Sequence, residues 1–234
     1  EIEIDRRLSA VMVPDFVQRE WETDLEINHR GVAVDMDFVN GALEIGSTTR
    51  NALIEEAVKI TGLDNPNSVA QLQGWLESET GEEIESLRKD TVAKMLTAND
   101  NSAEVQRMLE IRQELGKTST KKYNAIEKAV CRDNRVRGLL QFYGANRTGR
   151  WAGRLVQVQN LPRTYIEPLP FARTLVKDRK ADALRFVYGS VPDTLSQLIR
   201  TAFVAAEGNV LIDADFSAIE ARVISVSYTN LTLP

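Results

Sequence analysis

Apolar residues recur at helical spacing through the first part of the chain. Between residues 14 and 30, large apolar side chains return every three or four positions among charged ones, which predicts an amphipathic helix that Gly31 ends. A short extended segment, 32–35, should follow. Asp37 is then expected to cap a second helix that continues to about Gly62.

Turn-forming residues divide the next positions into further helices. The Asn-Pro-Asn-Ser turn at 65–68 is expected to cap the helix that follows it. The acidic stretch 78–86 predicts a surface loop, and residues 90–96 predict another short helix. From 102 to 130 the spacing is again helical, as one helix or as two that are broken near Gly116.

The pattern changes after the turn signal at 131–134. Short runs typical of β-strands follow at 137–143 and at 155–159. Residues 171–202 then return to a helical pattern. This mixture predicts an α+β fold that is mostly helical.

The composition is that of an ordinary soluble globular chain. Of its 234 residues, 43% are hydrophobic and 27% are charged, and no run is long and apolar enough for a membrane span. The first residues have no apolar signal-peptide core, so secretion is not expected. One cysteine and one histidine exclude an intrachain disulfide and a zinc site. Any chemistry must therefore depend on carboxylates, on lysine and arginine, or on a bound metal.

Positive charge is concentrated in one segment of an acidic chain. The net charge is −5, yet residues 117–173 hold 12 lysines and arginines against three carboxylates. Phe142, Tyr143 and Trp151 lie within the same segment, as expected of a nucleic-acid-binding surface. On charge alone, a solvated basic helix face explains the segment about as well.

Two carboxylates follow a predicted strand near the end of the chain. Residues 210–212 are apolar and predict a buried strand, after which Asp213 and Asp215 share one face because strand side chains alternate. Such a pair is a natural site for a divalent cation. A plain alternative is that the two aspartates only cap the helix expected from Ser217 to about Ile224.

The residues around Asp215 favour a metal site over a helix cap. They read Asp215-Phe216-Ser217-Ala218-Ile219-Glu220-Ala221-Arg222. This string resembles the first palm motif of the family A DNA polymerases. The resemblance implies that Asp215 binds both catalytic Mg²⁺ ions and that the carbonyl of Phe216 joins the coordination. It also implies that Glu220 occupies the place of a ribose 2′-hydroxyl and so selects deoxynucleotides, with Arg222 in the same catalytic set. Asp213 has no fixed role in the motif and is expected to act only as a nearby charge.

A second motif of the same family lies upstream. Thr148-Gly149-Arg150 is followed, nine residues after the arginine, by Gln159-Asn160-Leu161-Pro162. The resemblance implies that Arg150 reaches the minor groove near the primer terminus and that Gln159 and Asn160 contact the duplex near the templating end. Thr148, Arg154 and Gln157 are further DNA-binding candidates. Minor-groove acceptors are alike in all base pairs, so such donors check pair shape without reading sequence.

The second motif also departs from the family pattern. Ala152 and Gly153 stand where the family often has two serines, so a hydroxyl contact there is not expected. Gln157 stands where asparagine is usual. Thr-Gly-Arg alone would more often be a turn with a surface arginine, but two motifs in the family's order favour the polymerase interpretation.

Weaker matches extend the resemblance over most of the chain. Residues 115–123 resemble the thumb helix that carries Lys-x-x-Ser-x-Tyr, whose basic face grips the duplex backbone. Phosphate contacts position without specifying sequence, so Lys117, Lys121 and Lys122 are equivalent candidates. Residues 164–196 and the segment before Thr148 resemble the bacteriophage branch of the family.

The resemblance implies a right-hand polymerase of which the fingers and the rest of the palm are absent. The expected divisions are 1–13 as the tail of an upstream exonuclease-like domain, 14–40 as the palm lead-in, 41–130 as the helical thumb, 131–225 as the first part of the palm, and 226–234 as a non-native tail. That tail has β- and turn-like residues and resembles a translated sequencing adapter. Neither the family's fingers lysine nor its last palm motif is found.

The expected function is therefore a fragment of a template-directed DNA polymerase, inactive alone. It would use two Mg²⁺ ions to transfer deoxynucleotides to a primer 3′ end, in the replication of a phage. Its expected partners are primer–template DNA and, in the complete enzyme, deoxynucleoside triphosphates, with no membrane. We expect a monomer in the cytoplasm of a bacterial host. The alternative is a non-catalytic remnant that only holds primer–template DNA.

Overall fold

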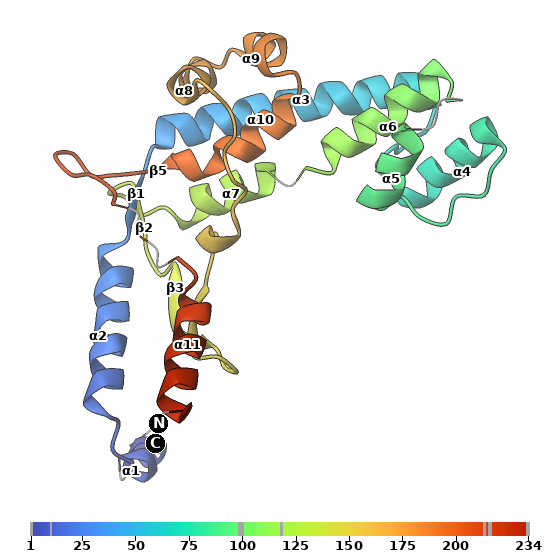
Figure 1. Ribbon diagram of the computed structural model, residues 1–234. Helices are drawn as coiled ribbons and strands as arrows, with labels where there is room; N and C mark the ends of the chain where they lie inside the picture. The colour runs from blue at the N-terminus through green and yellow to red at the C-terminus, as the bar shows by residue number, and fades with distance from the viewer. Residues whose placement is uncertain are drawn as a thin grey trace. The chain divides into compact units, whose positions relative to one another are not determined.

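The computed structural model describes residues 2–9, 11–97, 101–117, 119–212, 214 and 217–232. The chain divides into a large unit, Glu1–Val204, and a small unit, Ala205–Pro234, which are described separately. Helices dominate and two small sheets accompany them, as Figure 1 shows, so the α+β prediction is confirmed. Among the helices of the described ranges, none combines the length and the apolar character needed to cross a bilayer.

The large unit begins with helices and continues with alternating short strands and helices. In chain order its elements are α1 (Ile2–Leu8), α2 (Asp15–Arg30), β1 (Val32–Val34), α3 (Met36–Thr61), α4 (Val69–Thr80), α5 (Lys89–Leu96), α6 (Ala103–Leu115), α7 (Ser119–Ala129), β2 (Arg135–Val136), β3 (Leu140–Ala145), β4 (Arg150–Gly153), the 3₁₀ turn η1 (Val158–Asn160), α8 (Leu169–Lys177), α9 (Ala181–Tyr188), α10 (Val191–Leu198), the 3₁₀ turn η2 (Ile199–Ala202) and β5 (Phe203–Val204). The small unit contains α11 (Ile219–Thr232).

Helix α3 is the longest element described and runs through the large unit. It begins directly after Asp35, whose carboxylate accepts a hydrogen bond from the backbone amide of Phe38 at 3.2 Å. Asp37, the expected cap, lies inside the first turn, because the backbone is already helical from Met36. Gly62 ends the helix with a φ of +66°, a left-handed conformation that glycine adopts readily.

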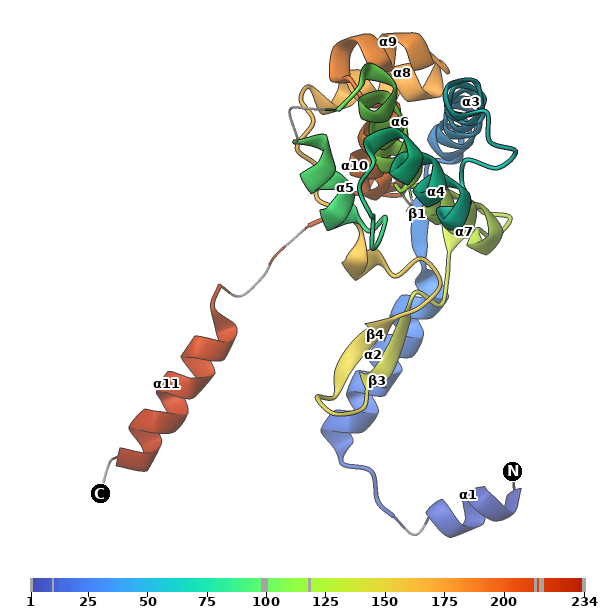
Figure 2. The same cartoon turned by 90° about the vertical axis from the view of Figure 1, so that its right-hand side faces the viewer.

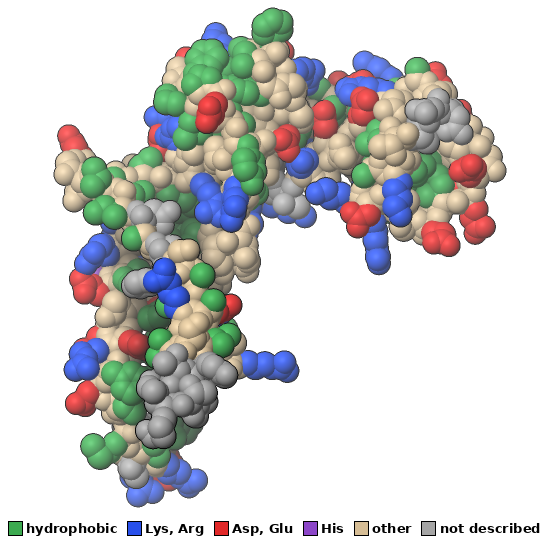
Figure 3. Space-filling model, in the orientation of Figure 1, with side chains coloured by type: hydrophobic (Ala, Val, Ile, Leu, Met, Phe, Trp, Pro, Cys, Tyr) green, Lys and Arg blue, Asp and Glu red, His purple; other side chains and the backbone are tan. Residues whose placement is uncertain are grey.

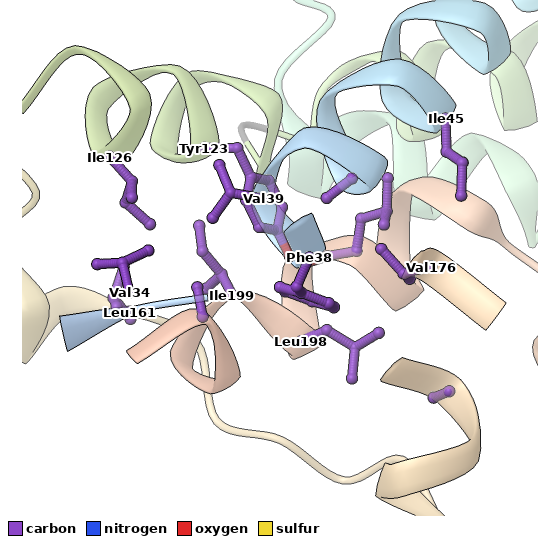
Figure 4. Close-up of a cluster of buried hydrophobic side chains, with 14 of the residues drawn as sticks. Val34, Phe38, Val39, Ile45, Tyr123, Ile126, Leu161, Val176, Leu198 and Ile199 are labelled. Atoms are coloured by element: carbon purple, nitrogen blue, oxygen red, sulfur yellow. Dashed lines mark hydrogen bonds between the residues drawn. The ribbon is translucent and has the colours of Figure 1, made fainter. Parts of the chain in front are cut away.

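Two hydrophobic clusters share α3. Its first half contributes Phe38 and Val39 to a cluster with side chains of α7, α8 and α10, and Figure 4 shows these residues beside Tyr123. Its second half contributes Leu53 and Ala57 to a separate cluster with side chains of α4, α5 and α6. One long helix therefore joins the part of the unit that carries the strands to the helical part.

Both sheets are antiparallel. In the three-stranded sheet β1 is central, with Val32 opposite Val136 of β2 and Ala33 opposite Val204 of β5. The other sheet is the β3–β4 hairpin, whose register is interrupted by a bulge between Gln141 and Ala145. This hairpin carries the Thr-Gly-Arg sequence.

The strand predicted at 155–159 is wrong. Leu155 and Gln157 have φ values of +54° and +55°, which a strand excludes, while Val156 is buried and residues 158–160 form η1. The second strand of the hairpin is β4 instead. The alternating apolar pattern arises because Val156 points into the first hydrophobic cluster between two turns.

The small unit also differs from the prediction in two places. Residues 210–212 are 65–87% exposed and form no strand, and among the described strands none pairs with them, so they lack the hydrogen bonds that a strand needs. Residues 226–232, expected to be β- and turn-like, continue α11. The helix predicted from Ser217 begins two residues later, at Ile219.

Candidate nucleic-acid interface

The Thr-Gly-Arg sequence forms the tip of the β3–β4 hairpin. The backbone amides of Thr148 and Gly149 both donate to the carbonyl of Ala145, at 3.0 and 2.9 Å. Gly149 has a φ of +69°, and a β-carbon there would lie 2.9 Å from Cε2 of Tyr143. The positive φ favours glycine here, and a larger residue would also have to displace the Tyr143 ring. The turn leaves Thr148 and Arg150 exposed.

Helix α2 supports the hairpin from one side. Asn28 uses both ends of its side-chain amide on Leu140 of β3, donating to the carbonyl and accepting from the backbone amide, each at 3.0 Å. Asp24 accepts a hydrogen bond from the indole Nε1 of Trp151 on β4 at 2.7 Å. These contacts join residues that lie more than a hundred positions apart in the sequence.

The Gln-Asn sequence lies against the base of the same hairpin. A β-carbon on Gly153, the last residue of β4, would overlap the side-chain amide of Gln159. In η1 the side chain of Asn160 donates to Oε1 of Gln157 at 3.3 Å, and all three of these side chains are exposed. The structure thus brings the two halves of the predicted motif into contact and leaves their amide groups accessible.

Buried residues anchor the segment between β4 and η1. The backbone amide of Arg154 donates to Leu139 at 2.7 Å, while Val156 and Leu161 lie in the first hydrophobic cluster. Arg200 donates to the carbonyl of Leu161 from Nη2 at 2.6 Å. Arg154 as a whole is exposed, and its Nη1 donates to the carbonyl of Gly153 at 3.4 Å, so the backbone here is fixed while the residue stays accessible.

The three candidate lysines differ in their surroundings. Lys117 forms an ion pair with Asp193, with Nζ 2.6 Å from Oδ1. Lys122 donates to the carbonyl of Val156 at 2.8 Å, so it holds α7 to the segment before η1. Lys121 is exposed, and no described residue makes a hydrogen bond or an ion pair with it. Of the three, Lys121 is therefore the best placed to meet a phosphate.

The tyrosine of the sequence that resembles the thumb helix faces inward. Tyr123 is fully buried, and its hydroxyl donates to the carbonyl of Leu195 on α10 at 2.8 Å. Burial raises the pKa of this phenol well above its ordinary value. Tyr123 therefore fixes α7 to α10 and does not contribute to an exposed surface.

A cavity of about 750 Å³ opens beside Lys117. Sequence reasoning missed three further cations that line it, Lys89 of α5, Arg112 of α6 and Arg163. No described residue forms a hydrogen bond or an ion pair with their side chains, although Lys89 is close enough to Asp193 to help lower its pKa. Arg163 follows directly after the Gln-Asn-Leu-Pro sequence, and this position could have pointed to it. Figure 3 shows acidic side chains around the part of the large unit where Figure 1 places α4 and α5.

Asp193 is the carboxylate that lines this cavity. Partial burial alone would raise its pKa, but hydrogen bonds from Lys117 and Gln197 outweigh burial and lower the pKa below the ordinary value. Asp193 is therefore charged at neutral pH and neutralises part of the positive field. The cavity remains cationic, because four basic side chains line it against this one carboxylate.

The model of the family "DNA polymerase family A" matches residues 42–230. The chain belongs to this family. It is also 53% identical over 229 residues to the DNA polymerase of Bacillus phage SP02, a match that covers 96% of this chain and 35% of the phage protein. The chain thus spans about a third of the length of this relative. No solved structure matches the chain significantly.

The string predicted to be the first palm motif lies only partly within the described residues. Asp213, Asp215 and Phe216 lie outside the described residues. In the small unit Glu220 is exposed in the first turn of α11, and Arg222 donates from Nε to the carbonyl of Ser217 at 3.0 Å. Within the described ranges there is no group of three or more histidine, cysteine or carboxylate side chains that could hold a metal ion.

Proposed function

We propose that this chain is the thumb and the first part of the palm of a template-directed DNA polymerase that acts in phage DNA replication. Membership of family A and the similarity to the SP02 polymerase support this assignment. The observation that carries it is the contact of Gly153 with Gln159, which joins the Arg150 hairpin to the Gln-Asn turn in one exposed group of hydrogen-bond donors.

These donors suit duplex DNA whose sequence varies. Arg150, Gln159 and Asn160 offer N–H groups, and the minor groove offers acceptors in every base pair. Thr148, Arg154 and Gln157 are exposed on the same two turns and extend the contact. Lys121 and the cations of the cavity supply backbone contacts that hold the duplex without selecting a sequence.

The chemistry would centre on the palm motif. We assign Asp215 and the carbonyl of Phe216 to Mg²⁺, Glu220 to exclusion of a ribose 2′-hydroxyl, and Arg222 to the same catalytic group. Bound Mg²⁺ would supply charge stabilisation for transfer of a deoxynucleotide to the primer 3′ end. Asp213 would add only a nearby charge. We propose that the chain is inactive by itself, because it spans only about a third of the length of the SP02 polymerase. The proposed setting is a monomer in the cytoplasm of the host bacterium.

A chimera tests the catalytic assignment. Residues 1–225 replace the matching segment of the SP02 polymerase, and primer extension and primer–template affinity are both measured. Asp215→Ala should abolish extension and leave DNA affinity nearly unchanged. The matched control, Asp213→Ala, removes a carboxylate two positions away and should retain most of the extension. Lost affinity with retained extension in Asp215→Ala would contradict the assignment.

The exposure of residues 210–212 favours a second candidate function, in which the chain holds primer–template DNA without chemistry. In that case residues 210–212 do not form the strand that the sequence predicts before the carboxylates. The same chimera separates the two functions. Primer extension by the chimera supports the polymerase, whereas a chimera that binds DNA but never extends a primer supports the remnant.

A further inference from the structure

A buried carboxylate on α2 holds the strand that carries Arg150. Asp24 is only 6% exposed, one of few polar residues in the described ranges that are so deeply buried. Its Oδ1 accepts from the indole of Trp151 at 2.7 Å, and its Oδ2 accepts from the side-chain amide of Asn28 at 3.1 Å. Both carboxylate oxygens are thus engaged, as a buried charge requires.

The same network reaches the other strand of the hairpin. Asn28 donates to Asp24 and, with the same side chain, makes both hydrogen bonds to the backbone of Leu140. In Figure 2 the β3–β4 hairpin lies along α2, as these contacts require. Asn28 therefore binds the backbone of β3, and Asp24, one helical turn away on α2, binds Trp151 of β4.

The hydrogen bond from Trp151 to Asp24 also affects the direction of the Arg150 side chain. Successive side chains of a strand point to opposite faces, and Arg150 and Trp151 are successive residues of β4. When Asp24 holds the indole toward α2, the neighbouring Arg150 side chain is directed to the other face of the hairpin. The edge-on contact of Trp151 with Phe142, at 5.6 Å between ring centroids, keeps the indole in this orientation.

We propose that Asp24 is a positioning residue for DNA binding, which acts through Trp151 on the orientation of Arg150. The inference rests on the proposed function, since it takes Arg150 as a DNA contact. It concerns a carboxylate far from both polymerase motifs in the sequence. Electrostatics alone predicts the opposite of a binding role, because a carboxylate near DNA repels phosphate.

The test is a double-variant cycle on primer–template affinity, measured by fluorescence anisotropy with the intact 234-residue chain. Asp24→Ala should weaken binding roughly fivefold, the size expected when a support of a contact residue is lost. In an Arg150→Ala background the same change should have no effect, because the residue through which Asp24 acts is gone. Asp24→Asn keeps an acceptor for the indole and loses only the longer hydrogen bond from Asn28, so it should restore most of the affinity.

Glu20 provides the matched control. It lies on the same helix, is exposed, and no described residue bonds to its carboxylate, so Glu20→Ala removes the same charge without touching the hairpin. The affinity of the Glu20→Ala variant for primer–template DNA should stay unchanged or rise slightly. Trp151→Phe removes the donor and keeps the ring, so it should weaken binding as Asp24→Ala does, and it serves if Asp24→Ala fails to fold.

The outcomes separate this inference from the proposed function. If Arg150→Ala leaves the affinity unchanged, the proposed DNA contact fails. If Arg150→Ala weakens binding but Asp24→Ala and Trp151→Phe do not, or weaken it equally in both backgrounds, the DNA contact stands and the positioning role is overturned. A fall that appears only when Arg150 is present supports both.

Discussion

Gly153 and Gln159 are in direct contact, since the side-chain amide of Gln159 occupies the space that a β-carbon on Gly153 would fill. The contact joins the end of β4 to the 3₁₀ turn that follows it. The pairing of Gly153 with Gln159 explains why the family's second serine position can be a glycine here: the space is used by the glutamine amide. The absence of a side chain at Gly153 thus lets Gln159 pack directly against the end of the hairpin that carries Arg150.

Gly153→Ala should displace the Gln159 side chain. We expect only a small loss of stability, because the exposed Gln159 side chain can turn away, together with weaker primer–template binding. Thermal unfolding and anisotropy measure the two effects. Gly74→Ala is the matched control, because a β-carbon at Gly74 on α4 meets nothing within 4 Å and should leave affinity unchanged. Unaltered DNA affinity in a folded Gly153→Ala protein would show that Gln159 does not depend on this contact.

Lys121 on α7 and Lys117, which precedes α7, should contribute differently to DNA binding. Lys121→Ala should weaken binding equally for all sequences and reduce the slope of log affinity against log salt by about one. Lys117→Ala should change the slope less, because Asp193 already neutralises its ammonium. The measurement is a salt titration of affinity for each variant. Equal changes in slope for the two lysines would contradict the distinction.

Asp193→Asn should strengthen DNA binding. The substitution keeps the shape of the side chain and removes the carboxylate that pairs with Lys117 and lines the cationic cavity. We therefore expect tighter binding at low salt and a steeper dependence on salt. Glu44→Gln on α3 is a control of equal charge change, since that carboxylate pairs with Arg179 and does not line the cavity. The idea fails if both variants raise affinity to the same extent.

Asp193 should also contribute to the pH dependence of stability. Its pKa is lowered in the folded chain, so its contribution is present above the ordinary carboxyl pKa and is lost as the pH falls through the lowered value. From about pH 4 downward, thermal unfolding of the wild type should therefore lose more stability than that of Asp193→Asn. Because the side chain is 40% exposed, the difference should be small and reduced by salt. Parallel pH profiles would show that the pair contributes nothing to folding.

Glu220 is the residue expected to exclude ribonucleotides. In the SP02 chimera, Glu220→Ala should admit ribonucleoside triphosphates and also slow deoxynucleotide incorporation, because space opens where the 2′-hydroxyl would sit. Single-nucleotide incorporation with each sugar gives the ratio directly. Glu207→Ala, at an exposed position of the same unit, serves as the control. An unchanged preference for deoxynucleotides would remove the selecting role from Glu220.

The sequence predicted those helices whose spacing and ends carry local signals. The helix over 14–30 ends at Gly31, and the turn at 65–68 caps its helix through Ser68, as expected. The strand over 155–159 failed because left-handed backbone at Leu155 and Gln157, neither of them glycine, has no local signature in an alternating pattern. The apolar run at 210–212 failed because a strand depends on a partner that the run itself does not supply.

The site was predictable only where a motif lies within a short stretch of sequence. Thr148 to Arg150 and the Gln-Asn pair were predicted in this way and stay predictions as DNA contacts, while the structure shows Gln159 against Gly153 at the end of the same hairpin. Asp24 and Asn28 could not be found, because their partners on the hairpin lie more than a hundred positions away. The cavity cations likewise meet only in the folded chain.

The affinity of the intact chain for primer–template DNA, measured at several salt concentrations with and without Arg150→Ala, tests the central claim most directly. We expect the logarithm of the affinity to fall linearly with the logarithm of the salt concentration. We also expect Arg150→Ala to lose the same affinity for unrelated duplex sequences. Binding without salt dependence, or an Arg150→Ala variant that binds as tightly as the wild type, would contradict the central claim.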